Sequence, residues 1–490
     1  MKLLIIGIDG AGDFLLNKTT MPFLTSLRDS NSAISLTEDL FSRGWAELFI
    51  GKHGSESGGL YQYPRLNGSF EFTPAFSCTD TSNHNQSINP LWTLLNSKGF
   101  SVGMQNLPTC YPAPQVNGFF ISGGGGGKFS FSGIPTSLVS SDEIRKILIK
   151  NNYVPDVMFR APLKFGSLSN YINILKKATT TYVNNFIELS TTIKPDIGLF
   201  IEKLTVELFF LAYKNIIDYQ SDIKNNSSQE NGSQLIFEYM QYLDNLIKKI
   251  FETLQPKHFI IVSDHSTAPF AHEGNTDILL RDLGFLNEVN FSAKFLRRGT
   301  GLLKRHYNRT TSSLNINHSI KSKLTPITSF NKKQTKAFGT FYDSGNIAGI
   351  YLNDERFSGT VNTRNRDTIL QQIMNNINST PEVKKYNMMA VPYRDTYSSS
   401  AFEKRLPDII LEKPDDIYFS SRNRNLFIAN KNNGVVSDDL SSCIYPNSGL
   451  KGRHPLLITD NHISSLVDSS DSNDLTLGYK LIDRLSDSSI

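Results

Sequence analysis

Two short apolar runs, far apart in the chain, each end in a carboxylate. Residues 2–10 read KLLIIGIDG, in which the apolar run ends at Asp9, and residues 259–265 read FIIVSDH and end at Asp264 and His265. Continuous apolar runs of this length are typical of strands buried in a parallel sheet. Because α/β sheets place their sites at the carboxyl ends of the strands, we expect these three side chains to meet.

The residue types at these strand ends predict a metal site. Carboxylate oxygens with one imidazole suit a divalent cation such as zinc, manganese or calcium, and the pattern does not choose among the three. The ordinary alternative is that Asp9 and Asp264 only form turns where the strands end, a role that Asp fills often. The sequence leaves both interpretations open.

The rest of the chain alternates between strand-like and helix-like patterns. Residues 90–96 followed by 100–104 illustrate the alternation, residues 196–200 read as a further strand, and residues 234–254 carry apolar positions at helical spacing. This is typical of a wound α/β sheet. We therefore predict an α/β fold, a three-layer α/β/α sandwich with a mainly parallel central sheet and a cap or lid insertion.

Composition narrows the class of protein. The 490 residues are 39% hydrophobic and 20% charged, as in ordinary globular proteins, and the net charge of +4 is too small to indicate a nucleic-acid partner. No apolar run is long enough to span a bilayer, and the N-terminal run closes on Asp9 without the pattern of a signal peptide. The three cysteines, Cys78, Cys110 and Cys443, are too scattered for a disulfide framework. We expect reduced thiols and a cytoplasmic protein.

One segment departs from the core pattern. Residues 291–333 hold ten Lys or Arg residues and no Asp or Glu. We predict that they form a basic insertion or lid, with residues 1–290 and 334–490 as the core. A solvated basic loop and an electrostatic funnel for an anionic substrate are equally compatible with this composition.

Several motifs, in order, resemble the alkaline phosphatase superfamily. The similarity is greatest to its type I phosphodiesterase/nucleotide pyrophosphatase branch, also described as phosphohydrolase/phosphomutase. The matching pieces are residues 5–10, Trp45 with residues 51–54, and residues 116–123, 262–265, 283–286, 349–353 and 406–410. The resemblance implies a metal-dependent enzyme acting on phosphate esters, with Asp9, Asp264 and His265 among the metal ligands.

The resemblance also implies a nucleophile at the start of a helix, shortly before a Thr-Gly pair that corresponds here to Ile50-Gly51. The family spacing lands on Phe41, so we predict that the adjacent Ser42 is the nucleophile and a metal ligand. A hydroxyl at a helix N-terminus, beside a metal and Arg43, would have its alkoxide stabilised. The alternative is that Ser42 is a helix N-cap.

Basic side chains near Ser42 are candidate substrate ligands. Arg43 has the planar fork that binds phosphate or sulfate, and Lys52 and His53 would add positive charge. Their alternative role is in surface salt bridges. The glycine run 123–127 followed by Lys128 lacks P-loop spacing, but the resemblance places it near the pocket. Gly123, Gly124 and Lys128 are therefore candidate oxyanion contacts, and a flexible surface loop is the alternative.

The chain departs from the two-metal members of the superfamily. Residues 200–210, FIEKLTVELFF, lack the Asp-x-x-x-His pair of the second metal site, and no histidine occurs between His84 and His258. His454 alone resembles a late ligand, so we predict one divalent metal ion. The formylglycine motif of single-metal branches is also absent, which favours direct attack by serine. His454 is then the candidate general acid, with a surface histidine as the alternative.

Three functions remain open from the sequence. The first is a metal-dependent hydrolase or transferase of phosphate esters, more specifically phosphodiesters, with a phosphorylated small molecule or a glycan-type compound as substrate. The second is a catalytically degenerate relative that binds a phosphorylated ligand or a partner. The third is a polyanion-binding module that uses residues 291–333.

Overall fold

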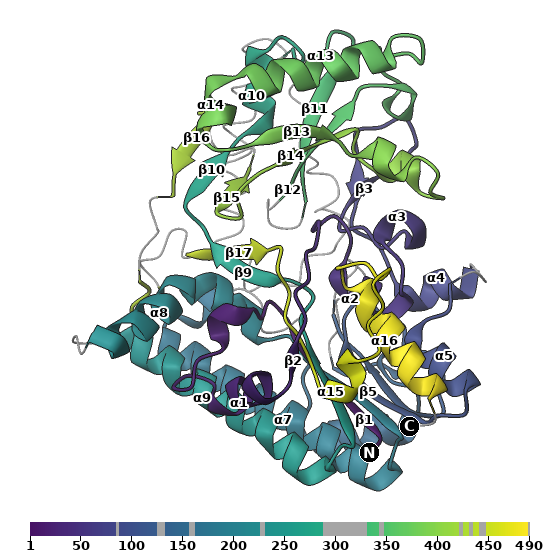
Figure 1. Ribbon diagram of the computed structural model, residues 1–490, viewed down its shortest axis with the longest axis vertical. Coiled ribbons are helices and arrows are strands. Elements are labelled where there is room, and N and C mark those ends of the chain that lie inside the picture. Colours follow the sequence, from purple (N-terminus) through teal and green to yellow (C-terminus); the bar gives the residue numbers. More distant parts are fainter. Residues whose placement is uncertain are drawn as a thin grey trace.

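A seven-stranded sheet forms the centre of the larger of two lobes (Figure 1). In this computed structural model the strand order is β2-β18-β8-β1-β7-β5-β6, and β8, β1, β7, β5 and β6 are parallel. β18 is antiparallel to β8 and to β2. The strands are β1 (Leu3–Ile8), β2 (Ser32–Ala33), β5 (Val102–Leu107), β6 (Gly118–Ser122), β7 (Ile197–Glu202), β8 (His258–Val262) and β18 (Leu457–Thr459). The predicted mainly parallel sheet is confirmed.

The structure describes residues 1–84, 88–124, 133–155, 162–225, 231–287, 331–342, 347–420, 425–430, 435–440 and 447–488.

Strand β1 is central because both of its faces are apolar. Leu4 and Ile6 belong to the hydrophobic cluster on one face of the sheet, and Leu3 and Ile5 belong to the cluster on the other. Alternate side chains of a strand point to opposite faces, so a continuous apolar run can be buried only between two layers.

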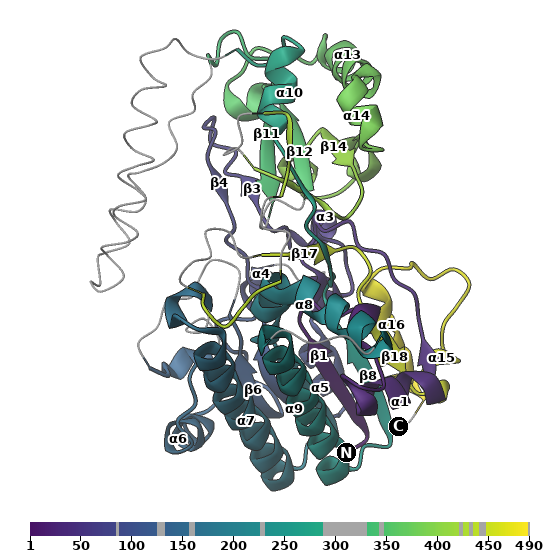
Figure 2. The same cartoon turned by 90° about the vertical axis from the view of Figure 1, so that its left-hand side faces the viewer.

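Helices cover both faces of the sheet (Figures 1 and 2). One face packs against α1 (Pro22–Ser30), α6 (Asp142–Lys150), α7 (Leu168–Ile193), α8 (Thr205–Asn225) and α9 (Asn231–Leu254). The other packs against α2 (Gly44–Ile50), α4 (Cys78–His84), α5 (Leu91–Ser97), α15 (Asn461–Ser464) and α16 (Thr476–Asp487). These layers are the predicted three-layer sandwich. No helix in the described part of the chain has the length and apolar character to cross a membrane.

The smaller lobe has a sheet and a hydrophobic cluster of its own. Four antiparallel strands, in the order β11-β12-β14-β13, form the sheet. Its elements are α10 (Thr276–Asp282), β11 (Ala337–Tyr342), β12 (Ile347–Leu352), α13 (Arg366–Ser379), α14 (Pro381–Lys385), β13 (Met389–Pro392) and β14 (Ile409–Glu412), beside a small sheet of β10 (His272–Gly274), β15 (Ile417–Phe419) and β16 (Phe427–Ala429). The sequence had grouped residues 334–490 with the core without separating this lobe. Most of the predicted lid, residues 291–330, lies outside the described residues.

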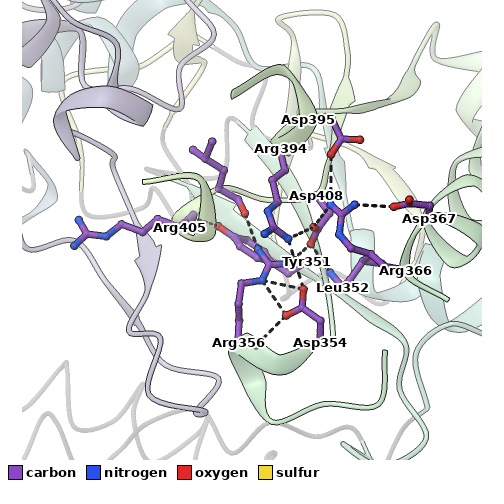
Figure 3. A network of polar contacts seen from close by, with 11 residues as sticks. Tyr351, Leu352, Asp354, Arg356, Arg366, Asp367, Arg394, Asp395, Arg405 and Asp408 are labelled. Carbon is purple, nitrogen blue, oxygen red and sulfur yellow. Dashed lines mark hydrogen bonds and ion pairs between the residues drawn. The ribbon is translucent and has the colours of Figure 1, made fainter. Parts of the chain in front are cut away.

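A buried ion-pair network joins the elements of the smaller lobe (Figure 3). The guanidinium of Arg356 pairs with Asp354 at 2.9 Å and also with Asp408, while Arg366 lies 3.1 Å from Asp408. Asp408 accepts a further hydrogen bond from the backbone N–H of Leu352 at 2.8 Å. The Asp408 carboxylate, which belongs to the 406–410 motif of the sequence, thus holds β12, β14 and α13 together.

Two antiparallel ribbons complete the described strands. β9 (Ser266–Pro269) pairs with β17 (Gly449–Gly452) between the two lobes, and β3 (Tyr63–Pro64) pairs with β4 (Phe72–Thr73). Because β9 directly follows His265, this ribbon brings the C-terminal part of the chain next to the carboxyl end of β8.

Candidate metal centre

Asp9, Asp264 and His265 form one buried cluster. Asp9 follows β1, and Asp264 and His265 follow β8, which is the parallel neighbour of β1. One ligand atom from each residue lies within 4.8 Å of the others, and all three side chains are buried. The structure therefore brings together the three side chains that the strand-end pattern singled out.

The hydrogen bonds of the cluster suit a cation. His265 donates from Nδ1 to the Ser266 carbonyl at 2.7 Å, which leaves Nε2 as the lone-pair nitrogen, 3.5 Å from Asp9 Oδ1 and 3.7 Å from Asp264 Oδ2. Such a backbone bond is the usual way to orient a metal-binding imidazole. Asp264 Oδ1 is buried and has no hydrogen-bond partner among the described residues. An anionic oxygen in that state is costly unless it has a positive partner.

Burial raises the pKa of both carboxyl groups in the cluster. It raises the pKa of Asp9 to about 6, and the neighbouring charge of Asp264 adds to the effect. Burial likewise raises the pKa of Asp264 to about 6. The charges of Lys203 and Lys451 act in the opposite direction on both pKa values. A divalent cation would favour the ionised forms further.

Lys203 and Lys451 are functional candidates that the sequence reasoning missed. Lys203 directly follows β7, the other neighbour of β1, and its Nζ donates to the Gly124 carbonyl at 2.9 Å. Lys451, on β17, is 7% exposed, and its Nζ donates to the Tyr61 hydroxyl at 2.7 Å. A signal existed for Lys203, since it occupies the same strand-end position as Asp9. Lys451 reaches the site through the β9–β17 ribbon, which sequence spacing does not reveal.

Helix α2 packs its first turn against the cluster. Trp45 donates from Nε1 to Asp9 Oδ2 at 3.0 Å. A Cβ atom on Gly44 would lie 2.2 Å from the Asp264 carbonyl oxygen, so only glycine allows this approach. The contacts of Gly44 and Trp45 with Asp264 and Asp9 therefore explain the sequence motif at Trp45.

Ser42 lies just outside this helix. Arg43, not Ser42, is the N-cap of α2, so the N-cap alternative for Ser42 is wrong. The Ser42 hydroxyl is buried and accepts a hydrogen bond from the Gly54 N–H at 2.7 Å. Phe41, where the family spacing lands, stacks on Tyr393 of the smaller lobe with ring centroids 4.7 Å apart. Attack by Ser42 and its ligation of a metal stay predictions.

The predicted phosphate ligands near Ser42 make structural contacts. Arg43 donates to the carbonyls of Leu60, Tyr61 and Pro74 at 3.0, 3.2 and 2.9 Å, which ties the segment after α3 (Gly54–Ser57) to α2. Its predicted role as a phosphate fork stays a prediction. Lys52 is half-buried in the turn after α2.

His53 pairs with a buried carboxylate. Its Nε2 lies 2.9 Å from Asp39 Oδ2, and its ring stacks on Tyr397 with centroids 4.4 Å apart. Burial alone would lower the pKa of His53, but the charge and hydrogen bond of Asp39 outweigh it and hold that pKa above its usual value. The ion pair with Asp39 favours the protonated imidazole and compensates its charge, which weakens the case for His53 as a ligand for a second anion.

The glycine run is described only at its beginning. Gly123 donates to the Leu107 carbonyl at 2.7 Å, and the Gly124 carbonyl accepts from the Thr109 N–H at 3.2 Å as well as from Lys203. Lys128 lies outside the described residues. Gly124 thus contacts a cation beside the cluster, while the oxyanion role of the run stays a prediction.

His454 borders a different space. Its Nδ1 lies 3.3 Å from the Leu36 carbonyl, and the exposed ring faces a cavity of about 340 Å³ lined also by Phe14, Ser266 and Thr267. Asp9, Asp264 and His265 are not among the described residues that line this cavity. Among the described residues, His454 is not part of the buried group of Asp9, Asp264 and His265, and its role as general acid stays a prediction.

Comparison with known proteins supports the fold. No family model and no curated protein matches the sequence. Phosphonoacetate hydrolase from Sinorhizobium meliloti 1021, solved with phosphonoformate, matches over 98% of this chain and 95% of its own, with a TM-score of 0.54 and 10% identity. Murine ectonucleotide pyrophosphatase/phosphodiesterase 5 in complex with AMP matches 99% of this chain and 95% of its own, with a TM-score of 0.47 and 10% identity. The chain has the alkaline-phosphatase-like fold, as its sequence resemblance predicted.

Proposed function

We propose that the protein is a metal-dependent hydrolase of phosphate esters, with phosphodiesters as the preferred class. The observation that carries the proposal is the buried Asp9–Asp264–His265 cluster, with one carboxylate oxygen that lacks a partner among the described residues, at the carboxyl end of the sheet. One solved structure with this fold is named phosphonoacetate hydrolase. Fold alone does not define chemistry, so the weight rests on the cluster.

The residues of the cluster would hold one divalent ion, which is zinc, manganese or calcium. Asp9 and Asp264 would supply oxygen ligands and His265 would supply Nε2. When bound, such an ion supplies Lewis-acid stabilisation of negative charge on a phosphoryl group. With no second Asp-His pair in residues 200–210, Lys203 and Lys451 provide the remaining positive charge next to the carboxylates.

The other proposed roles are substrate binding, nucleophilic attack and proton donation. Lys203 and Lys451 bind non-bridging oxygens of the substrate, and a diester, with less charge than a monoester, suits this limited cationic site. Ser42, whose oxygen accepts from the Gly54 N–H, attacks phosphorus as water takes up its hydroxyl proton, and the ester oxygen departs. A second water then cleaves the phosphoryl–serine bond and restores the hydroxyl. His454 donates a proton to the departing oxygen after its ring turns from the Leu36 carbonyl. Arg43, Lys52, His53, Gly123, Gly124 and Lys128 complete the proposed substrate contacts. The substrate is a phosphorylated small molecule or glycan-type compound in the cytoplasm.

A second function is favoured by one specific observation. Ser42 is 1% exposed and hydrogen-bonded to the backbone, and the side chain at the family's nucleophile position, Phe41, is packed on Tyr393. A protein with these features can bind a metal and a phosphorylated ligand without turnover. The polyanion-binding alternative rests on the composition of residues 291–333 alone.

Turnover assays separate these functions. The protein, loaded in turn with zinc, manganese and calcium, is assayed with chromogenic phosphate diesters, monoesters and sulfate esters. We expect diester hydrolysis that Asp264→Asn abolishes and that Asp282→Asn, at an exposed carboxylate paired with Arg281, preserves. Metal binding without hydrolysis of any ester would favour the second function, and hydrolysis retained by Asp264→Asn would contradict the first.

A further inference from the structure

Two cysteines that are distant in the sequence lie in neighbouring segments close to Ser122. Cys78 is the first residue of α4, and Cys110 lies in the loop after β5. Both thiols are fully buried, and burial together with the neighbouring Cys78 raises the pKa of the Cys110 thiol. Cys78 Sγ also lies 3.5 Å from Thr109 Oγ1, so it faces the loop that carries its partner.

Backbone contacts on both sides hold the two segments in this arrangement. The N–H of Cys78 donates to the Thr109 carbonyl at 2.8 Å, and the Thr79 hydroxyl donates to the Cys110 carbonyl at 3.1 Å. The Ser122 hydroxyl donates to the same Cys110 carbonyl at 2.9 Å. These contacts place the backbones of Cys78 and Cys110 side by side.

We propose that Cys78 and Cys110 are an oxidisable pair that closes to a disulfide when the protein meets a peroxide. One sulfur attacks the peroxide and becomes a sulfenic acid with release of water. The other sulfur then displaces a second water and forms the S–S bond. The two sulfurs lose two electrons in total, and one hydrogen peroxide is reduced to two waters.

Closure would act on the loop next to the metal centre. Thr109 donates to the Gly124 carbonyl, which also accepts from Lys203. A bond from Cys110 to α4 would restrain this loop. It would also lower the conformational entropy of the unfolded chain, which stabilises the fold. The proposal does not depend on the reaction that the metal centre carries out.

The test is oxidation of the reduced, full-length native protein with hydrogen peroxide, followed by tryptic mapping without reductant. Lys98 separates the two cysteines, so a disulfide appears as a link between two tryptic peptides. We expect that link, loss of two of the three thiols titrated after denaturation, their recovery with dithiothreitol, and a higher melting temperature of the oxidised form.

Single-cysteine variants make the outcome decisive. Cys443→Ser should still form the link, whereas Cys78→Ser and Cys110→Ser should each lose both the link and the rise in melting temperature. Three thiols that persist after oxidation, oxidation to sulfinic acid without a link, or a link that requires Cys443 would overturn the proposal.

Discussion

Asp264 Oδ1, which has no hydrogen-bond partner among the described residues, makes the cluster a candidate binding site. Buried carboxylate oxygens normally accept hydrogen bonds, and an unsatisfied one costs roughly 1–3 kcal/mol. Asp264 Oδ1 has no partner among the described residues, while Oδ2 of the same carboxylate lies 3.7 Å from His265 Nε2, which is itself 3.5 Å from Asp9 Oδ1. A cation would satisfy all three groups at once, whereas a strand-end turn would give no reason for their convergence.

The first prediction concerns the hydroxyl of Ser42. Ser42→Ala should reduce kcat for diester hydrolysis on the order of a thousandfold or more if this oxygen attacks phosphorus. It should also cost about 1 kcal/mol of unfolding free energy, because the Gly54 N–H loses its acceptor. Steady-state kinetics and urea unfolding measure the two effects separately.

Ser448→Ala is the matched control. The Ser448 hydroxyl is equally buried and accepts a hydrogen bond from the Lys214 N–H at 3.0 Å. This variant should lose similar stability and keep its activity. If Ser42→Ala behaves in the same way, the hydroxyl has a structural role only.

Glu38 and Glu47 are both buried, and burial together with the charge of Glu38 raises the pKa of Glu47. Burial raises the pKa of Glu38 from 4.5 to about 8, and Asp39 adds to the effect. Because the pKa in the folded state exceeds the unfolded value, the proton stabilises the fold. That stabilisation is complete below about pH 4.5 and is lost as the pH rises through about 8.

Glu38→Gln should therefore flatten the decline of stability between pH 5 and 8. The amide oxygen can still accept from the Leu475 N–H, which lies 2.8 Å from the carboxylate in the native protein. We expect a gain of about 1 kcal/mol or more at pH 8 relative to the native protein. Urea midpoints across this pH range measure it, with Glu56→Gln, an exposed site, as the control. Parallel pH profiles for the native protein and Glu38→Gln would refute the assignment.

Sequence patterns predicted part of the site and missed the rest for a physical reason. Asp9, Asp264 and His265 end apolar runs, so their position could be read directly. Glu38 and Glu47 lie in segments without such a run, and nothing local shows that they are buried against one another. Lys451 reaches the cluster only through strand pairing with β9.

At the scale of elements, the first turn of α2 fixes the geometry of the cluster. Gly44→Ala would force a Cβ atom to within 2.2 Å of the Asp264 carbonyl oxygen, so either the helix or Asp264 must shift. We expect metal affinity to fall by about 10-fold to 100-fold, as for changes that disturb the support of metal ligands. Isothermal titration with the preferred cation measures it.

Gly99→Ala is the control for this prediction. Gly99 has φ +86°, and a Cβ atom added there would meet no described atom within 4 Å, so substitution introduces backbone strain of about 1 kcal/mol without a clash. Its metal affinity should match that of the native protein. Equal affinities for both variants would show that the α2 contact does not support the ligands.

The elements themselves were predicted unevenly. β1, β7, β8 and α9 follow the expected ranges closely, because continuous apolar runs and helical spacing are strong local signals. The smaller lobe was not separated from the core. Its strands, such as β12 (Ile347–Leu352), are as apolar as those of the central sheet, and their antiparallel pairing depends on contacts between distant segments.

Contacts between Tyr393 and the segment before Ser42 join the smaller lobe to the larger one. The Tyr393 hydroxyl donates to Asp39 Oδ2 at 2.5 Å, and the Tyr393 ring stacks on Phe41. Asp39 also accepts from the N–H groups of Phe41 and Ser42 at 2.8 and 3.3 Å. The segment that carries Ser42 is therefore coupled to the position of the smaller lobe.

Tyr393→Phe should loosen this junction. Loss of the hydroxyl removes a hydrogen bond to a charged acceptor, worth about 1.5–3 kcal/mol. We expect faster amide hydrogen exchange in residues 389–406 and 39–43, with exchange in β1 and β8 unchanged. Tyr479→Phe, which loses a bond to the Asn89 carbonyl within the larger lobe, should leave the junction as it is. Unchanged exchange in both variants would argue against a lobe junction at Tyr393.

We expect that strands from opposite halves of the chain bind one divalent cation. Metal content of protein purified without chelators, measured by plasma mass spectrometry, tests it most directly. We expect one equivalent of zinc, manganese or calcium per chain, which is lost in Asp264→Asn and retained in Asp282→Asn. Absence of bound metal together with no uptake of any of the three ions, or full retention by Asp264→Asn, would contradict it.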